Sequence, residues 1–374
     1  MKRLRFYFIL LFLLSTLVGC AETKILDRVG LVTLVAYDVG TEEKMSTTAV
    51  IREVNPEFQS NVEVITTENE TSKGNRMKTN RKLSKKVVVG QMRVILFGEE
   101  LAKDDIHHYI DLHLENAAVS NSLYMAVVEG QVAPVLEYEY QNIDDIGQHI
   151  FRLLEQNIEQ ENMISSTLHE IAHDYYTVGE DIFMPILKKE EEMVEISGIA
   201  IFKDGKMVSI LPPEDAFYVK LIAENLKSGT SEVVLEKDDL INNLTKNTNE
   251  QIPIAFDAIS SKKELKLVNS STPEFDLNIK IKARITEVFP DLNLGDPKVV
   301  SELEKAISKN LLRDISRVIE YCQSVESDVF AFGEKYRSSL RNSKLTKEKW
   351  HEIYKDMKVN VDVDFTILRS GIFE

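Results

Sequence analysis

The sequence is poor in cysteine, glycine and positive charge. It has 2 cysteines and 15 glycines among 374 residues, and 45 lysines and arginines stand against 61 aspartates and glutamates. The net charge of −16 argues against a nucleic-acid partner, because binding to phosphates depends on basic side chains. The low glycine content and the absence of P-loop and G-x-G-x-x-G motifs also disfavour a nucleotide-binding site. We expect no cofactor.

The first twenty residues have the pattern of an export signal. Three positive charges fall within the first five positions, and residues 6–18 form an almost uninterrupted apolar run. About 13 apolar residues are too few for a membrane-spanning helix, which needs roughly 20. The run closes with Leu17-Val18-Gly19-Cys20, which resembles a bacterial lipobox. That resemblance implies cleavage of residues 1–19 and lipidation of the Cys20 thiol.

Lipidation at Cys20 would decide how the rest of the chain is held. Acyl chains supply an anchor at roughly 0.8 kcal/mol per buried methylene. Removal of residues 1–19 lowers the net charge from −16 to −19, so an anionic membrane surface would repel the body as a whole. We therefore expect the lipid on Cys20 to attach the chain to a membrane, outside the cytoplasm. With Cys20 acylated, Cys322 has no partner for an intramolecular disulfide.

The hydrophobic patterning predicts an α+β protein with several domains, in which mixed or antiparallel sheets pack against long amphipathic helices. After the signal, residues 1–19, about 355 residues remain, enough for two or three domains. We expect an N-terminal α+β domain over residues 20–190, within which residues 130–190 could form a separate helical subdomain. A C-terminal α+β domain would follow over residues 191–374.

In the N-terminal half, apolar alternation and helical spacing predict five strands and three helices. The strands are expected at residues 29–39, 44–54, 62–67, 87–97 and 122–129. The helices are expected at residues 99–114, 144–160 and 165–176.

In the C-terminal half, Asp204-Gly205 between two apolar runs predicts a hairpin with a two-residue turn. A helix is expected from Pro212 to near Gly229. A long helix is expected over residues 297–326, capped by Asp296 and carrying Cys322 on its apolar stripe. Further elements are predicted as strands at residues 231–236, 252–260 and 263–269 and a helix at residues 346–357.

Two further strands have complementary charges on their polar faces. Residues 277–286 alternate apolar side chains with Asn278, Lys280, Lys282 and Arg284, whereas residues 359–367 alternate them with Asn360, Asp362 and Asp364. Opposite charges across neighbouring strands stabilise a sheet by a few tenths of a kcal/mol and help to fix its register. We therefore predict that the two strands are neighbours in one sheet.

One motif is typical of an enzyme. His169, Glu170 and His173 match H-E-x-x-H inside a predicted helix, a spacing that places two imidazoles on one face for zinc and a glutamate to activate water. Residues 174–192 contain no third histidine, and Pro185 leaves little room for a helix that could supply a ligand glutamate. A zinc peptidase is therefore the alternative, and a helix surface the preferred interpretation. His107, His108 and His113 are expected to be exposed polar residues.

The segment from Thr71 to Lys86 has seven lysines and arginines and no acidic residue. Such a run is typical of a solvated helix or loop. In a chain of such negative charge it could also face anionic headgroups or an acidic partner. Both interpretations stay open at the level of sequence.

Several stretches together resemble the spore germination GerC family, the lipoprotein C subunit of nutrient germinant receptors. They are residues 91–102, with Gly98-Glu99-Glu100-Leu101-Ala102 at a helix start, the hairpin at residues 196–208, Ser327 to Gly333, and Trp350. The chain departs from the family pattern at Ala21-Glu22-Thr23, where a Trp-Asp pair is frequent, and at Ser209, where glycine is usual.

The resemblance implies a non-enzymatic lipoprotein on the outer face of the spore inner membrane. It implies assembly with integral membrane A- and B-type receptor subunits and contact with membrane lipid through Cys20. A lipid-anchored solute-binding protein is a second alternative, although the two halves of the chain show no repeated βαβ pattern.

Overall fold

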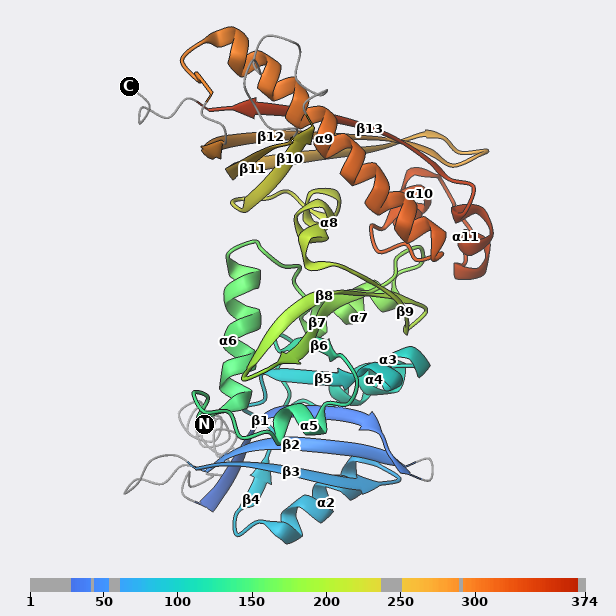
Figure 1. Cartoon of the computed structure of the whole chain (residues 1–374). Coiled ribbons are helices and arrows are strands. Elements are labelled where there is room, and N and C mark those ends of the chain that lie inside the picture. Colours follow the sequence, from blue (N-terminus) through green and yellow to red (C-terminus); the bar gives the residue numbers. More distant parts are fainter. Residues whose placement is uncertain (1–27, 42–43, 54–60, 237–250, 289–291, 369–374) are drawn as a thin grey trace, which may run out of the picture.

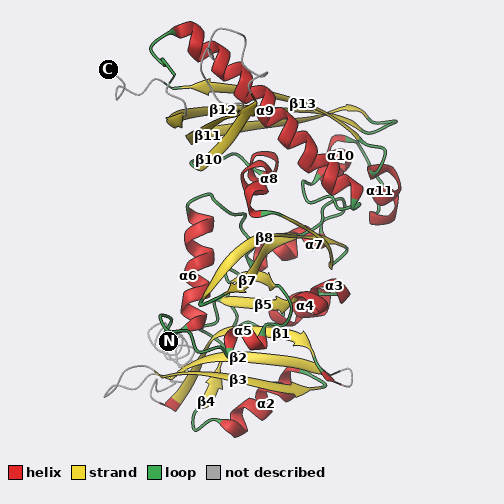
Figure 2. Ribbon diagram, viewed as in Figure 1, coloured by secondary structure: helices red, strands yellow, loops and turns green. Residues whose placement is uncertain are grey.

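The protein consists of two mixed β-sheets, one towards each end of the molecule, with helices on their faces (Figures 1 and 2). The computed structural model describes residues 28–41, 44–53, 61–236, 251–288 and 292–368. The α+β class, with mixed sheets and long amphipathic helices, is thereby confirmed. No helix in these ranges is both long enough and apolar enough to cross a membrane.

The first sheet has the strand order β3-β2-β1-β5-β6-β7-β8-β9, with β4 paired to β1. Its strands are β1 (Val29–Val39), β2 (Met45–Glu53), β3 (Asn61–Asn69), β4 (Lys86–Val88), β5 (Val94–Gly98), β6 (Tyr124–Val128), β7 (Phe183–Glu190), β8 (Met193–Lys203) and β9 (Lys206–Leu211). The pairs among β1, β5, β6 and β7 are parallel, and the outer pairs are antiparallel.

Helices cover both faces of this sheet, and its central strands are buried on both sides. The helices in this part of the chain are α2 (Ser72–Lys82), α3 (Glu99–Asp104), α4 (His107–Leu114), α5 (Ala133–Leu136), α6 (Ile146–Glu159) and α7 (Leu168–Tyr176). On β5, Ile95 and Phe97 join a core with α3, α4 and α7, whereas Val94 and Leu96 join a second core with α5 and α6. This alternation follows from the two-residue period of a strand.

The second sheet has the order β10-β11-β12-β13 and is covered by one long helix (Figure 1). Its strands are β10 (Thr230–Glu236), β11 (Gln251–Asn269), β12 (Glu274–Val288) and β13 (Lys358–Ile367), and its helices are α9 (Pro297–Ser324), α10 (Phe332–Ser339) and α11 (Lys347–Tyr354). The Asp296 carboxylate accepts a hydrogen bond from the backbone N–H of Lys298, which confirms the predicted cap of the long helix. Six residues of its predicted apolar stripe are buried on the sheet: Leu303, Ile307, Leu311, Ile315, Val318 and Cys322.

The strand pairing predicted from charge is confirmed. β12 and β13 are parallel neighbours, with Lys280 opposite Asp364 and Asn278 opposite Asp362. The predicted hairpin turn is confirmed as well, since Asp204 and Gly205 have φ angles of 50° and 82° and join β8 to β9. In both cases a local pattern agrees with the final pairing.

Two predicted elements of the first half are each divided in the structure. Residues 87–97 form β4 and β5 rather than one strand, because the chain turns at Gly90 and Gln91. Residues 99–114 form α3 and α4 rather than one helix. The break lies at Asp105, whose carboxylate accepts a hydrogen bond from the backbone N–H of His107, while the N–H of Ile106 donates to the carbonyl of Gly205.

Two predictions in the second half are also corrected. The strands expected at residues 252–260 and 263–269 are one continuous strand, β11, with an irregular register between Ala258 and Ser260. The helix expected to reach Gly229 is shorter: a 3-10 turn at Pro213–Asp215 leads into α8 (Ala216–Ala223). The chain then runs on as a loop to β10.

The position between residues 190 and 191, predicted as a domain boundary, lies at the turn between β7 and β8. Those two strands pair along their whole length, so the first sheet extends to Leu211. Side chains of β8 and β9 belong to the same core cluster as the second sheet and α9, including Ile199, Ile201 and Leu211. The two sheets are therefore joined by a continuous apolar core.

The central turns of α9 should carry much of the stability of the second sheet. Leu311 is fully buried and its neighbour Leu312 is 36% exposed. We expect Leu311→Ala to lower the free energy of unfolding by about 2–5 kcal/mol, through lost apolar contact and a residual cavity. Leu312→Ala, the matched control, should change it by less than about 0.5 kcal/mol. Urea denaturation measures both, and equal effects would contradict the assigned face of α9.

Candidate functional site

The motif residues Ser327 to Gly333 and Trp350 meet at a buried junction between the two halves of the chain. Asp328 lies just beyond the end of α9 and is 1% exposed. Its Oδ1 accepts a hydrogen bond from the N–H of Phe332 at 3.1 Å. Its Oδ2 accepts from the N–H of Gly333 at 2.8 Å and from Trp350 Nε1 at 2.9 Å. One carboxylate therefore joins α9, the start of α10 and the middle of α11.

A second buried carboxylate, Asp181, comes from the segment that leads into β7. The N–H of Asp181 donates to the carbonyl of Asp328, and the N–H of Asp328 donates back to Asp181 Oδ2, both at 2.9 Å. Asp181 Oδ1 also accepts from the N–H of Asp204 in the β8–β9 turn at 3.0 Å. Asp181 thus connects the first sheet to the motif of the second half.

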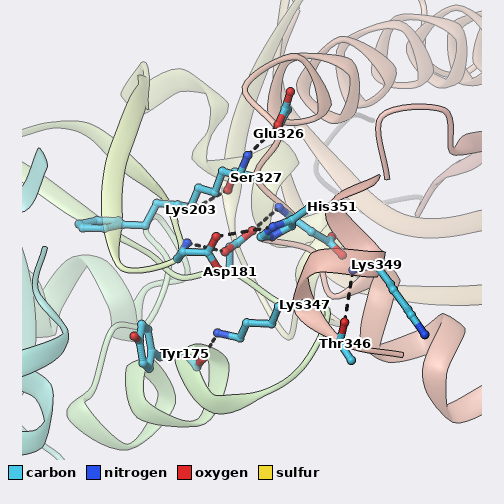
Figure 3. A network of polar contacts seen from close by, with 12 residues as sticks. Tyr175, Asp181, Lys203, Glu326, Ser327, Thr346, Lys347, Lys349 and His351 are labelled. Carbon is cyan, nitrogen blue, oxygen red and sulfur yellow. Dashed lines mark hydrogen bonds and ion pairs between the residues drawn. The ribbon is translucent and has the colours of Figure 1, made fainter. Parts of the chain in front are cut away.

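Side chains around the two carboxylates complete the junction. The Ser327 hydroxyl donates to the carbonyl of Phe202 on β8, and Tyr354 Oη donates to the carbonyl of Ser327 at 2.8 Å. At the rim, shown in Figure 3, Lys203 forms an ion pair with Glu326 at 2.6 Å, and Lys347 Nζ donates to the carbonyl of Tyr175 at 2.6 Å. Each of these contacts either joins the two halves of the chain or positions a residue that joins them.

Two glycines allow the backbones to approach this closely. Gly179 has a φ of 88°, and a Cβ atom built on it would lie 2.4 Å from the carbonyl carbon of Gly333. A Cβ atom on Gly333 would lie 2.5 Å from the Cα of Gly179 and 2.6 Å from the ring of Trp350. Because these neighbours are backbone and a buried ring, neither position can accept a side chain without displacement of the junction.

The electrostatics of the junction follow from burial. Burial raises the pKa of Asp328 to about 8, although the hydrogen bonds from Gly333, Phe332 and Trp350 oppose this rise. Burial also raises the pKa of Asp181. Nearby, burial and the negative charge of Asp174 raise the pKa of Glu180 to about 7. Such groups resemble the perturbed acids of active sites, but both Asp181 and Asp328 are held by backbone donors and have a structural role here.

The H-E-x-x-H residues lie on α7, and their glutamate is engaged in the start of that helix. Glu170 accepts hydrogen bonds from the N–H of Thr167 at 2.9 Å and from the Ser165 hydroxyl at 2.6 Å, and the Thr167 hydroxyl completes a capping box. Burial raises the pKa of Glu170, but these hydrogen bonds outweigh it and leave the pKa below its usual value. Its carboxylate is thus committed to helix capping.

The two histidines of the motif are exposed, and only one of them lies among possible metal ligands. In the described ranges, His173, Asp174 and Glu180 form one group with ligand atoms within 4.8 Å of one another, and Asp181, Asp204 and His351 form another. His169 belongs to neither group. The arrangement therefore does not reproduce two histidines on one zinc ion.

One of the other histidines is buried, contrary to expectation. His113 is 6% exposed, and its Nε2 lies 2.9 Å from Tyr37 Oη. Burial lowers the pKa of His113 to about 4, so its ring is neutral at physiological pH. Both side chains line a cavity of about 590 Å³ between α2, α4 and the first sheet. The prediction failed because Tyr37 lies 76 residues away in the sequence.

Only one of the two cysteines lies in the described part of the chain. Cys20, the predicted lipidation site, lies outside the described residues. Cys322 is fully buried on α9, and burial raises the pKa of its thiol. A buried thiol with a raised pKa is a poor nucleophile.

Asp181 and Gly179, which the junction requires, were not predicted from the sequence. The only local signal was a glycine in a short connection between a helix and a strand, Val178-Gly179-Glu180-Asp181. Their partners lie about 150 residues further along the chain, at Asp328 and Gly333. Pairing between residues so far apart in the sequence is set by tertiary packing and produces no periodic pattern.

Two family models match the chain. One, described as "Spore germination protein N-terminal domain", matches residues 22–189, and the other, described as "Spore germination B3/ GerAC like, C-terminal", matches residues 197–371. The interval between the two matches covers the β7–β8 turn and the first residues of β8. The junction described above therefore joins the two matched regions.

Named relatives and a solved structure agree with these models. "Spore germination protein GerQC" of Bacillus cereus is 27% identical over 368 residues, which cover 98% of this chain and 99% of the relative. "Spore germination protein B3" of Bacillus subtilis (strain 168) is 21% identical over 300 residues, 75% of this chain and 74% of the relative. The crystal structure of the GerBC protein matches with a TM-score of 0.55 and 19% identity, covering 90% of this chain and 97% of that one.

The glycine contact should be highly sensitive to substitution. We expect Gly333→Ala to lower the free energy of unfolding by about 3 kcal/mol or more, because the added Cβ meets backbone and a buried ring. Gly90→Ala is the control, since the nearest atom to its Cβ would be 3.8 Å away, and it should stay within about 0.5 kcal/mol. Comparable unfolding midpoints for the two variants would contradict the close approach.

The junction should also make stability depend on pH. A carboxyl group with a raised pKa in the folded chain binds more protons folded than unfolded, so the free energy of unfolding falls as pH rises. For Asp328 the free energy of unfolding falls between pH 3.8, the ordinary pKa of the group, and about pH 8, its pKa in the folded chain. Urea unfolding at pH 5 and pH 8 should show a smaller decline in Asp328→Asn than in the original chain. The exposed Asp362→Asn should keep the full decline, and an unchanged decline in Asp328→Asn would refute this role.

Proposed function

Because the chain belongs to the spore germination GerAC-like family of germinant-receptor C subunits, we propose that it is a non-catalytic, lipid-anchored receptor subunit on the outer face of the spore inner membrane. In this proposal it acts with integral membrane A- and B-type subunits during germination. The observation that carries the proposal is the match of two consecutive family models over residues 22–371. The first match begins two residues after Cys20.

The anchor is supported by the order of features at the N-terminus. A positively charged start and an apolar run precede Leu17-Val18-Gly19-Cys20, and the family match begins directly after it. Cleavage before Cys20 would leave a folded body whose first described strand, β1, starts nine residues later. That spacing allows the body to lie against a membrane that holds the lipid.

A non-catalytic role is supported by the state of the candidate catalytic groups. Glu170 caps α7, and His169 lies apart from the groups of possible metal ligands in the described ranges. Asp181 and Asp328 hold the two halves together. A solute-binding protein would have two similar lobes, whereas the two sheets here differ in strand order and number among the described residues.

The proposal is tested by removal of the predicted lipid attachment site. After a high-salt wash that removes electrostatically bound protein, we expect Cys20→Ala to leave the membrane fraction of spores and to impair germination on nutrients, because the body then has no lipid anchor. Cys322→Ala, the matched control, removes the other thiol and should leave the protein in the membrane fraction. Membrane fractionation and a nutrient-germination assay measure these two effects, and metabolic labelling with an alkyne fatty acid shows whether acylation is lost with Cys20.

Two results would refute parts of this proposal. Membrane retention of Cys20→Ala at the level of the original chain would contradict the proposed lipid anchor. Failure of the detergent-solubilised, lipidated protein to co-purify with A- and B-type subunits would contradict the proposed assembly.

A further inference from the structure

Helix α2 presents a concentrated positive surface on a strongly negative protein. Five of its eleven residues are lysine or arginine, and Lys85 and Lys86, the first residue of β4, follow it. The segment from Thr71 to Lys86 contains no acidic residue. We call this the basic surface, formed by Lys73, Arg76, Lys78, Arg81, Lys82, Lys85 and Lys86.

The helix is held to the sheet by polar contacts and not by an apolar face. Its buried residues are Asn75 and Thr79, and Asn75 Nδ2 donates to the carbonyl of Met45 and to Thr47 Oγ1, both at 2.9 Å. Its one large apolar side chain, Met77, is 54% exposed among the cations. The outer face of α2 is therefore cationic with one apolar side chain, a composition that suits the headgroup region of a membrane.

Four of the seven cations have no partner inside the described part of the chain. Lys78 and Lys82 donate hydrogen bonds to carbonyls of β3, and Lys85 pairs with Glu53 at 3.5 Å. Lys73, Arg76, Arg81 and Lys86 are exposed and make no hydrogen bond or ion pair through their side chains. Their charges are available to an external anion.

Strand pairing brings the basic surface to the place where the chain arrives from Cys20. In β4, Lys86 pairs with Val29, the first residue of β1. Cys20 is nine residues before Val29, a span of about 30 Å at most when fully extended. Figure 1 shows α2 and β4 at one end of the molecule and the second sheet at the other.

We propose that the basic surface binds anionic phospholipid headgroups and turns this end of the first sheet towards the membrane. The proposal rests on the lipid anchor proposed above, which holds the surface within reach of the headgroups. An anchored body of net charge −19 is repelled by an anionic bilayer in most orientations. The orientation that brings α2 to the lipid is the attractive one, and it points β10 to β13 away from the membrane.

Vesicle binding of a chain without its own lipid tests the surface separately from the anchor. The chain from residue 20 onwards, carrying Cys20→Ala, is sedimented with vesicles of phosphatidylglycerol and phosphatidylcholine or of phosphatidylcholine alone. We expect binding only to the anionic vesicles, and its loss as added salt shortens the screening length. Since each cation near such a surface contributes roughly fivefold, reversal of Lys73, Arg76, Arg81 and Lys86 to Glu should weaken partitioning by roughly a hundredfold or more.

A matched variant separates local binding from total charge. Reversal of four exposed lysines of the second half, Lys298, Lys305, Lys344 and Lys349, to Glu changes the net charge equally and should leave binding within about twofold. Circular dichroism confirms that both variants are folded. Absence of binding to anionic vesicles, equal binding to neutral ones, or equal loss in both variants would each overturn the proposal. Because the protein used in the vesicle assay carries Cys20→Ala and no lipid, each result is independent of whether Cys20 is acylated in spores.

Discussion

The structure depends on two buried carboxylates that hold the two halves of the chain together. The N–H of Asp181 donates to the carbonyl of Asp328, and the N–H of Asp328 donates to the carboxylate of Asp181. The two carboxylates also accept hydrogen bonds from the β8–β9 turn, α10 and α11. A buried carboxylate without donors is strongly destabilising, so each contact depends on the others being in place. The close approach of Gly179 and Gly333 lets the backbone of the first half lie against the start of α10, beside these donors.

The junction also explains why a continuous core can run between sheets of different topology. Ile199, Ile201 and Leu211 of the first sheet share a core cluster with α9 and the second sheet. A second polar contact links α9 to the segment after β9, where Arg317 donates a hydrogen bond to Asp215 at 3.1 Å. Apolar packing alone would permit the sheets to slide, because it has no directional preference. The directional hydrogen bonds of the junction fix their relative position.

The sequence predicted those features whose cause is local or leaves a recognisable pattern along a strand. The Asp204-Gly205 turn, the Asp296 cap and the pairing of β12 with β13 each follow from short-range chemistry or from a charge pattern along a strand. Where distant residues decide, prediction failed: Ile106 meets Gly205 and divides a helix, and Tyr37 buries His113. The motif at residues 327–333 was identified from its resemblance, but its partner Asp181 could not be, since nothing in the spacing links positions 147 residues apart.

Because the junction couples the two sheets, the location of β1 has a consequence for the far end of the molecule. The chain enters at β1, beside β4 and α2, and the second sheet lies at the opposite end (Figure 1). If the junction were flexible, orientation of the first sheet would say nothing about where β10 to β13 lie. Because Asp328 is hydrogen-bonded both to Asp181, beside β7, and to Trp350 of α11, a constraint on one end is passed to the other. Under the proposed anchoring, the end of the first sheet that faces the membrane therefore also sets the distance of β10 to β13 from it.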